Sequence, residues 1–358
     1  MEGGLSLESK DFLKSLSNKT GVSGTEEEIT KVVKEVFGDY IDESRTDALG
    51  NLITLKRGEG KESDKPQIML AAHIDEIGLM VKEIDEKGFL KFTTVGGIDQ
   101  RTLVGQEVLV YGKEVVKGII GAKPPHVQDK KEQKQAIKLK DMYIDLGRNV
   151  KEVKGLVEVG DLIVVTREFC DLEGNRVSGK SLDDRAGVTM VLECLKELQR
   201  LKHASDVYGV ATVQEEVGVR GATTSTYGIV PDIGIAIDVC HGEMPGVSDE
   251  ETANLGEGPV IFLGPQVHPK LHKKLKRVAQ EFDISYQIGT STSPRGTDAF
   301  AIQVTRSGIP TALVSIPLRY MHTSVETLDL NDIKKGGRLL ANFISQVDSE
   351  FVEGLRCF

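Results

Sequence analysis

Tryptophan is absent from this chain of 358 residues, and cysteine is rare. The four cysteines are scattered and form no C-x-x-C pair: Cys170, Cys194, Cys240 and Cys357. This usage is typical of free, mostly buried thiols in a reducing cytoplasm and disfavours a disulfide framework.

Long apolar runs are also missing. No apolar segment approaches the ~20 residues that a membrane-spanning helix needs. The N-terminal stretch MEGGLSLESKDF has neither the basic start nor the apolar core of a secretion signal. We therefore expect a cytoplasmic protein without a membrane partner.

Positive charge is in deficit. The net charge of −10 and the pI near 5.4 disfavour nucleic acid as a main partner, because little would neutralise its phosphates. The apolar fraction of 39% and the charged fraction of 28% are those of an ordinary globular protein. A chain of this length exceeds what one hydrophobic core usually serves, which favours two domains.

The chain shows two different patterns of predicted secondary structure. Residues 83–175 contain short β-type segments separated by glycine turns, among them QEVLVYG and VVKGIIGA, which predicts a small barrel or sandwich. In residues 1–82 and 176–358, strand and helix patterns alternate, which predicts a layered α/β domain around a largely parallel, mixed sheet. We interpret the β segment as a domain inserted into the α/β domain.

Two local predictions concern the N-terminal part. Ser23 and Glu26 have the spacing of a capping box at the start of a helix. Residues 50–58 alternate as a strand, and the buried run 67–72 is expected to be the neighbouring strand.

Polar side chains interrupt the chain where predicted strands end. The stretch QIMLAAHIDEIGLMV (67–81) leaves an apolar run at a histidine and two acids. Acids or histidines also follow three later strands, and an Asp-Asp pair opens a helix. These candidates are His73, Asp183, Glu215, Glu216, Asp238 and His322. Because the carboxyl ends of strands in an open α/β sheet converge, we expect these side chains to form one site.

The residue types indicate the chemistry. Two imidazoles and three carboxylates suit two divalent ions such as zinc or cobalt, with one carboxylate bridging them. The adjacent Glu215 and Glu216 allow one glutamate to bind metal while the other acts as general base. Asp75, two residues beyond His73, can bond its imidazole and fix the tautomer.

Each piece alone has a simpler explanation. An Asp-Asp pair at a helix start is about as often an N-cap favoured by the helix dipole. A histidine at a strand end is more often a satisfied core or surface residue, and His322 could cap a turn. Asp238 is harder to dismiss, because IGIAID buries everything before it and an unpaired carboxylate there would be costly. The prediction of a metal site therefore rests on all of these residues occurring together at element boundaries.

Several stretches together resemble one family. AAHIDEIG (71–78), SLDDRAG (181–187), QEEVGVRGA (214–222), AIDVCHG (236–242) and the long segment 296–326 are similar to motifs of the tetrahedral (TET) aminopeptidases. Members of this family of dinuclear metallo-aminopeptidases are also described as glutamyl or deblocking aminopeptidases, or as endoglucanases. The resemblance spans nearly the whole chain.

The resemblance implies five metal ligands: His73 and Asp238 for one ion, Glu216 and His322 for the other, and Asp183 bridging both. It also implies Glu215 as general base, Asp75 as the acid that orients His73, and a cis bond between Asp183 and Asp184. The expected function is metal-dependent removal of N-terminal residues from short peptides.

The resemblance further implies an α/β zinc-peptidase domain whose inserted β domain makes dimer contacts. Such dimers would assemble into a hollow particle of twelve subunits that admits only unfolded peptides. Two positions depart from the family pattern, Arg295 in place of glycine and Cys240 in place of threonine. Arg295 could favour an acidic substrate group, or could simply be a surface loop residue.

Two other functions stay open. A glycoside hydrolase uses two carboxylates, but it needs no imidazole pair and usually presents aromatic platforms, whereas this chain has no tryptophan. An assembly protein with a vestigial metal site would need no general base, which both glutamates argue against. The preferred N-terminal residue and the native metal are not predictable, and Arg319 and Tyr320 could line the specificity pocket or only support a loop.

Overall fold

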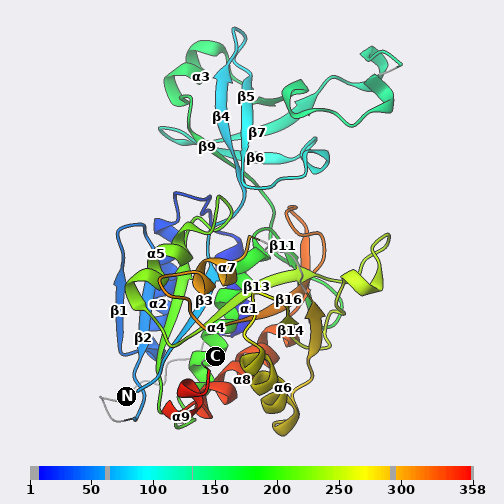
Figure 1. The fold of residues 1–358 in the computed structure, drawn as a ribbon. Coiled ribbons are helices and arrows are strands. Elements are labelled where there is room, and N and C mark those ends of the chain that lie inside the picture. The colour runs from blue at the N-terminus through cyan, green and yellow to red at the C-terminus, as the bar shows by residue number, and fades with distance from the viewer. Residues whose placement is uncertain (1–7, 61–64, 131, 291–295, 356–358) are drawn as a thin grey trace.

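The computed structural model describes residues 8–60, 65–130, 132–290 and 296–355. Arg295 and Cys357 lie outside the described residues. The chain forms two bodies, a β-barrel and a larger α/β domain, joined by two connecting segments (Figure 1). No helix within the described ranges is long and apolar enough to cross a membrane.

An eight-stranded mixed sheet is the centre of the α/β domain. Its strands, in order across the sheet, are β1 (Glu43–Thr46), β2 (Leu52–Lys56), β12 (Asp206–Thr212), β3 (Gln67–His73), β13 (Ile233–His241), β16 (Thr311–Leu318), β14 (Val260–Leu263) and β15 (Gln287–Thr290). The four central strands, β12, β3, β13 and β16, run parallel, whereas β2 and β14 are antiparallel to them. The layered α/β prediction with a mixed sheet is therefore confirmed.

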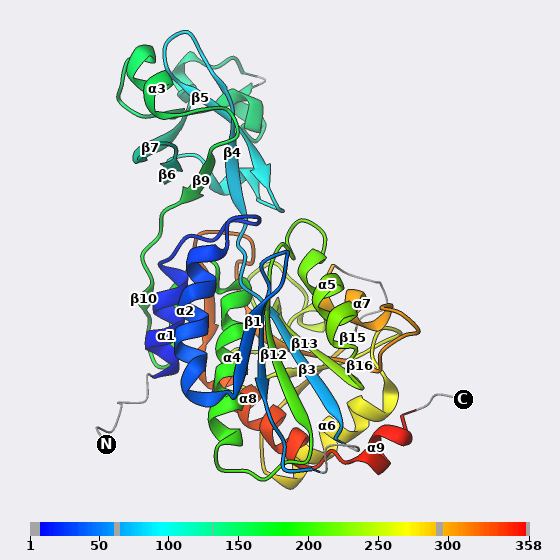
Figure 2. The same cartoon turned by 90° about the vertical axis from the view of Figure 1, so that its left-hand side faces the viewer.

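Helices cover both faces of this sheet, which explains why β3 is apolar throughout its centre (Figure 2). Ile68, Leu70 and Ala72 of β3 belong to the core of one face, and Met69 and Ala71 to the core of the other. The first face is covered by α1 (Ser9–Ser17), α2 (Glu27–Phe37), α4 (Leu182–Leu198), α6 (Pro269–Glu281) and α8 (Leu330–Ser345). The second is covered by α5 (Arg220–Ile229) and α7 (Asp298–Gln303), and α9 (Ser349–Glu353) ends the described chain.

The second body is a closed barrel with its own hydrophobic core. Its strands, in order around the barrel, are β4 (Gly78–Ile84), β5 (Leu90–Val95), β8 (Met142–Asp145), β7 (Val115–Ala122), β6 (Glu107–Tyr111) and β9 (Leu162–Val165), with α3 (Val150–Leu156) beside them. Exposed and buried residues alternate along β7, so one side chain in two faces the barrel interior. The barrel strands begin at Gly78 and end at Val165, so both limits precede those of the predicted insertion, 83–175.

The chain then returns through a small three-stranded sheet of β10 (Cys170–Asp171), β11 (Arg176–Gly179) and β17 (Glu326–Asp329). β11 leads directly into α4, and β17 follows the loop after β16. This small sheet therefore joins two segments that deliver predicted site residues.

Three local predictions are wrong. Residues 52–56 do not pair with β3, because β12 lies between the two strands. Ser23 does not cap a helix: α2 begins at Glu27, and the Ser23 hydroxyl instead donates a hydrogen bond to Asp75. The described thiols are not mostly buried, since Cys170 is exposed, Cys240 is half-buried and Cys194 alone is fully buried.

Candidate metal centre

The parallel centre of the sheet brings the predicted residues together. His73 ends β3 opposite Thr212, the last residue of β12, and Glu215 and Glu216 follow in the next loop. Asp238 lies inside β13 rather than at its end, because this strand continues to His241. His322 lies in the loop between β16 and β17. Asp183 comes from the first turn of α4.

Three of the segments that deliver these side chains have unusual backbone conformations. Ser181, Gln214 and His322 have φ values of 55°, 55° and 61°, in the left-handed region that non-glycine residues seldom occupy. The bond between Asp183 and Asp184 is cis, as the resemblance implies. Left-handed residues of this kind are often found at functional sites.

Asp183 lies at the centre of the cluster. Its Oδ1 is 3.2 Å from Nε2 of His73, and its Oδ2 is 3.4 Å from Nε2 of His322. Each oxygen of one carboxylate therefore faces a different imidazole. This is the arrangement expected of a carboxylate that bridges two cations.

Two groups of potential ligands share this carboxylate. His73, Asp183 and Asp238 offer ligand atoms that lie within 4.8 Å of one another, and Asp183, Glu216 and His322 do the same. Nε2 of His322 is also 3.6 Å from Oε1 of Glu216. Imidazole and carboxylate are the donors that zinc and related divalent ions bind.

The electrostatics of the cluster favour bound cations. Burial, strengthened by repulsion from Asp183, raises the pKa of Asp238 to about 8 and that of Glu216 to about 7. Burial also raises the pKa of Glu215 to about 10. Divalent cations would supply the positive charge that these carboxylates need in order to ionise together. The donor set and its charge thus fit two metal ions.

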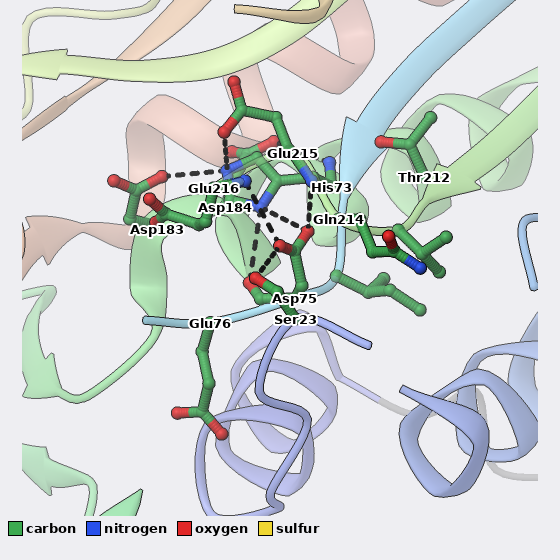
Figure 3. A network of polar contacts seen from close by, with 12 residues as sticks. Ser23, His73, Asp75, Glu76, Asp183, Asp184, Thr212, Gln214, Glu215 and Glu216 are labelled. Carbon is green, nitrogen blue, oxygen red and sulfur yellow. Dashed lines mark hydrogen bonds and ion pairs between the residues drawn. The ribbon is translucent and has the colours of Figure 1, made fainter. Parts of the chain in front are cut away.

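The Asp75 carboxylate lies between Ser23 and the segment that carries Glu215 and Glu216 (Figure 3). It accepts hydrogen bonds from the Ser23 hydroxyl at 2.6 Å and from the backbone N–H groups of Glu215 and Glu216 at 3.0 and 3.2 Å. Its Oδ1 is 3.4 Å from Nδ1 of His73. Burial opposes ionisation, yet the hydrogen bonds from His73 and Ser23 hold the pKa of Asp75 below its ordinary value. Asp75 therefore contacts one imidazole and the backbone of the loop that carries both glutamates.

Sequence reasoning missed two further acids that bind the backbone of candidate ligand residues. Glu326, the first residue of β17, accepts hydrogen bonds from the backbone N–H groups of Asp183 and His322 at 3.1 and 2.9 Å. Asp184 accepts from the backbone N–H of His73 and, as an N-cap would, from that of Gly187. Both acids are buried. The segment that carries Glu326 was part of a recognised motif, but only its pairing with the α4 segment gives it a role.

A buried charge network lies beneath the cluster. Glu76 accepts hydrogen bonds from Nζ of Lys180 and the hydroxyl of Ser181, both at 2.6 Å, and lies 3.3 Å from Arg185. Nη1 of Arg185 donates to the carbonyl oxygens of Leu16 and Lys19. The network thus ties the end of α1 to the start of α4.

The other side of the cluster opens into a cavity of about 980 Å³. His73, Asp183, Glu215, Glu216 and Asp238 all line it. Oε1 of Glu215 has no hydrogen-bond partner among the described residues, although the residue is buried, with 8% of its surface exposed. One oxygen of the Glu215 carboxylate therefore lies at the cluster without a hydrogen bond from the described residues.

The structure shows where Arg319 and Cys240 lie relative to the cavity. Arg319 does not line the cavity; its guanidinium binds the backbone and side chain of Glu243, so it supports a loop. Cys240 lines the cavity, two residues after Asp238.

Comparison with known proteins finds an aminopeptidase family. The family model described as M42 glutamyl aminopeptidase matches residues 50–339. A protein of Acetivibrio thermocellus is 40% identical over 93% of this chain and 98% of its own length. The lysyl aminopeptidase of Pyrococcus furiosus is 35% identical over 90% of this chain and 93% of its own.

Solved structures share the fold. A TET aminopeptidase from a marine sediment archaeon of the Thaumarchaeota matches with a TM-score of 0.92 and 35% identity, covering 97% of this chain and 98% of that one. The TET1 peptidase of Pyrococcus horikoshii, which can assemble into a tetrahedron or a large octahedral shell, matches with a TM-score of 0.83 and 36% identity, covering 95% and 100%. An endoglucanase structure from Thermotoga maritima matches with a TM-score of 0.76 and 30% identity, covering 96% and 99%.

Proposed function

The chain belongs to the M42 glutamyl aminopeptidase family, and we propose that it is a dinuclear metallo-aminopeptidase that removes N-terminal residues from short peptides. The observation that carries this proposal is the Asp183 carboxylate, whose two oxygens face two different histidines at 3.2 and 3.4 Å. A peptidase function is what the family and its relatives support; the two-metal chemistry is our inference from the site.

The ligand assignment follows the two groups of donor atoms. His73 and Asp238 would hold one ion, Glu216 and His322 the other, and Asp183 both. When bound, two such cations would lower the pKa of a water molecule and polarise the scissile carbonyl. Zinc and cobalt both suit these donors.

Glu215 is the residue that we assign to proton transfer. Its Oε2 lies 4.0 Å from Nε2 of His73, and its Oε1 is unpartnered among the described residues. In this position its carboxylate can accept a proton from the attacking water and then donate it to the leaving amine. Positive charge nearby would lower its raised pKa towards the value that a base needs.

Asp75 has the supporting role in this mechanism. It contacts the ring of His73 and both backbone N–H groups of the Glu215–Glu216 pair, so one carboxylate sets the relative positions of a ligand and the base. Positioning of this kind reduces the reorganisation that would otherwise accompany catalysis.

Assembly into a large homo-oligomer is a further part of the proposal. A relative with 36% identity over 95% of this chain can assemble into a tetrahedron or an octahedral shell. We propose a twelve-subunit particle built from dimers that the barrel domain joins, inside which only short or unfolded peptides reach the site.

The test is an assay of aminoacyl amides with the purified full-length chain, before and after removal of metal by a chelator. The proposal expects activity that disappears on chelation and returns with zinc or cobalt. Activity that survives thorough removal of metal would contradict it.

Glycoside hydrolysis is the weaker alternative. A similar structure is described as an endoglucanase. The acids of this site, however, surround two imidazoles and share one bridging carboxylate, whereas a glycosidase places an acid and a base on either side of a sugar. A cellulose assay on the metal-loaded protein separates the two functions.

A further inference from the structure

The chain between α1 and α2 is held against the segment that leaves β3. In residues 21–26, which we call the N-terminal strap, Val22 forms a parallel bridge with Glu76. The backbone N–H of Glu76 donates to the carbonyl oxygen of Gly21 at 2.9 Å, and the backbone N–H of Ser23 donates to that of Glu76 at 3.3 Å. Backbone pairing therefore fixes the strap next to the acids that follow His73.

The strap contributes to holding the loop of residues 214–216, which carries the two adjacent glutamates. Asp75 accepts hydrogen bonds from the backbone N–H groups of Glu215 and Glu216. Oε1 of Glu26, the last residue of the strap, accepts a hydrogen bond from the backbone N–H of Gln214 at 3.1 Å. Three consecutive N–H groups of the loop are thus bound by two carboxylates, one of which belongs to the strap.

The strap also contacts the other carboxylate. The Ser23 hydroxyl donates to Oδ2 of Asp75 at 2.6 Å, and the same oxygen accepts from the backbone N–H of Glu216 (Figure 3). Glu26 is itself oriented within the strap, since its Oε1 also accepts from the backbone N–H of Gly24 at 2.7 Å. Two side chains of the strap therefore reach the loop, one directly and one through Asp75.

The backbone of Gln214 is in an unfavourable conformation. Its φ of 55° lies in the left-handed region, which residues other than glycine seldom occupy. Such a conformation persists where the surrounding contacts fix it, and the bond to Glu26 is one of these contacts. Because Gln214 directly precedes Glu215, its conformation sets the direction in which the chain presents that side chain.

Glu26 can influence the site only through this loop. It is buried, with 6% of its surface exposed, and it is not among the residues that line the cavity beside the candidate metal centre. Although it precedes α2, its side chain makes no capping hydrogen bond to that helix. The hydrogen bond to Gln214 is therefore the contact by which its loss would reach the site.

We propose that the N-terminal strap positions the general base, with Ser23 and Glu26 as positioning residues that hold the loop 214–216 and thereby direct Glu215 towards the candidate metal centre. The inference rests on the proposed function, in which Glu215 transfers the proton. A displacement of about 1 Å in a reacting group can cost on the order of 10²-fold in rate. Loss of the strap contacts should therefore lower kcat, while bound metal is retained.

Hydrogen exchange tests the positioning independently of activity. Amide exchange of the metal-loaded, full-length protein is followed by mass spectrometry in peptides that contain residues 213–217. Glu26→Ala removes the acceptor, so exchange in these peptides should become about tenfold faster. The matched control is Glu27→Ala, because Glu27 is the next residue and is exposed. It should leave the exchange of the loop unchanged.

Kinetics of aminoacyl amide cleavage test the consequence for catalysis. In Glu26→Ala, kcat should fall on the order of 10²-fold, with KM and the metal content at saturating zinc unchanged. Glu26→Gln keeps an oxygen that can accept the same hydrogen bonds, so it should retain most of the wild-type kcat. Adding Gln214→Gly to Glu26→Ala should restore part of kcat, because glycine adopts a positive φ without strain. A glycine would not repair general damage to the fold.

Ser23→Ala is a milder second variant, which keeps the test decisive if Glu26→Ala does not fold. It removes one hydrogen bond to a charged group, so kcat should fall about tenfold.

The outcomes separate the two proposals. A metal-loaded wild type that cleaves no amide contradicts the proposed function, while the exchange experiment still decides whether the strap holds the loop. Unchanged exchange in Glu26→Ala overturns the positioning. Faster exchange with an unchanged kcat overturns it as well, since the strap would then support only the structure. Loss of metal in Glu26→Ala would mean that the strap serves the ligand Glu216 rather than the base.

Discussion

The acids behind the candidate metal centre and the acids in front of it have opposite surroundings. Behind it, the carboxylates of Asp75, Glu76 and Glu326 each accept two or more hydrogen bonds from backbone N–H groups, hydroxyls or cations. In front, Oε1 of Glu215 has no partner among the described residues. Asp238 accepts one hydrogen bond, from its own neighbour Val239.

This difference distinguishes the acids expected to support the structure from the acids expected to bind ligands. A carboxylate whose two oxygens both accept hydrogen bonds from the protein is held in place, and its removal is expected to disturb structure. A buried carboxylate with open oxygens is costly unless something else binds it. We therefore expect the acids in front of the cluster to bind cations, water and substrate, and the acids behind it to hold them in position.

The largest effect that sharpens this contrast is expected for Glu215→Gln. The amide keeps the shape of the side chain but cannot accept the proton, so kcat should fall on the order of 10³-fold. Metal content, measured by elemental analysis, should stay at that of the wild type. Loss of metal instead would mean that Glu215 is a ligand and that the roles of Glu215 and Glu216 are exchanged.

Among the acids behind the cluster, Glu76→Gln should have the largest effect on stability. It leaves Lys180 and Arg185 buried without their countercharge, which typically lowers the free energy of unfolding by about 3–5 kcal/mol. Urea denaturation of the metal-free protein measures this. Glu28→Gln, at the exposed pair with Lys31, is the control and should leave the denaturation midpoint unchanged.

The pH dependence of stability gives a related prediction. Burial is outweighed by the charges of Lys180 and Arg185, which lower the pKa of Glu76 from 4.5 to about 2. The folded-state pKa is depressed, so the stabilisation is complete above pH 4.5 and is lost as the pH falls towards 2. The stability difference between wild type and Glu76→Gln should therefore shrink below pH 4.5, by up to about 3 kcal/mol. A constant difference between pH 5 and pH 3 would contradict this account.

A smaller effect is expected for Glu326→Gln. Glu326 binds the backbone of two ligand residues rather than a metal, so its amide variant should weaken metal affinity by about 10–100-fold without abolishing binding. Calorimetric titration of the metal-free protein with zinc provides the measurement. Glu281→Gln, on the exposed face of α6, is the matched control. An affinity equal to that of the control would remove Glu326 from the positioning network.

Much of the architecture could be predicted from the sequence because its signals are local. The apolar run of β3 ending at His73 and the periodic helix α8 are both evident from hydrophobic patterns. β1, β15 and β17 were not predicted: they are short, and all four residues of β1 are exposed, so no alternation marks it. Strand order could not be predicted either, since the pairing of β2 with β12 joins residues far apart in the chain.

The candidate site divides in the same way. His73, Asp183, Glu215, Glu216, Asp238 and His322 could be proposed because each is an unexpected polar residue at an element boundary or in a buried strand. Glu326 could not, because its role depends on the pairing of β17 with β11, which brings it to the start of α4.

The most direct test of the account is to locate metal in crystals of the protein by anomalous scattering, after loading with zinc or cobalt. We expect two peaks per chain, about 3.5–4 Å apart, on either side of the Asp183 carboxylate. One peak should contact His73 and Asp238, and the other Glu216 and His322. A single peak, or peaks remote from Asp183, would contradict the account.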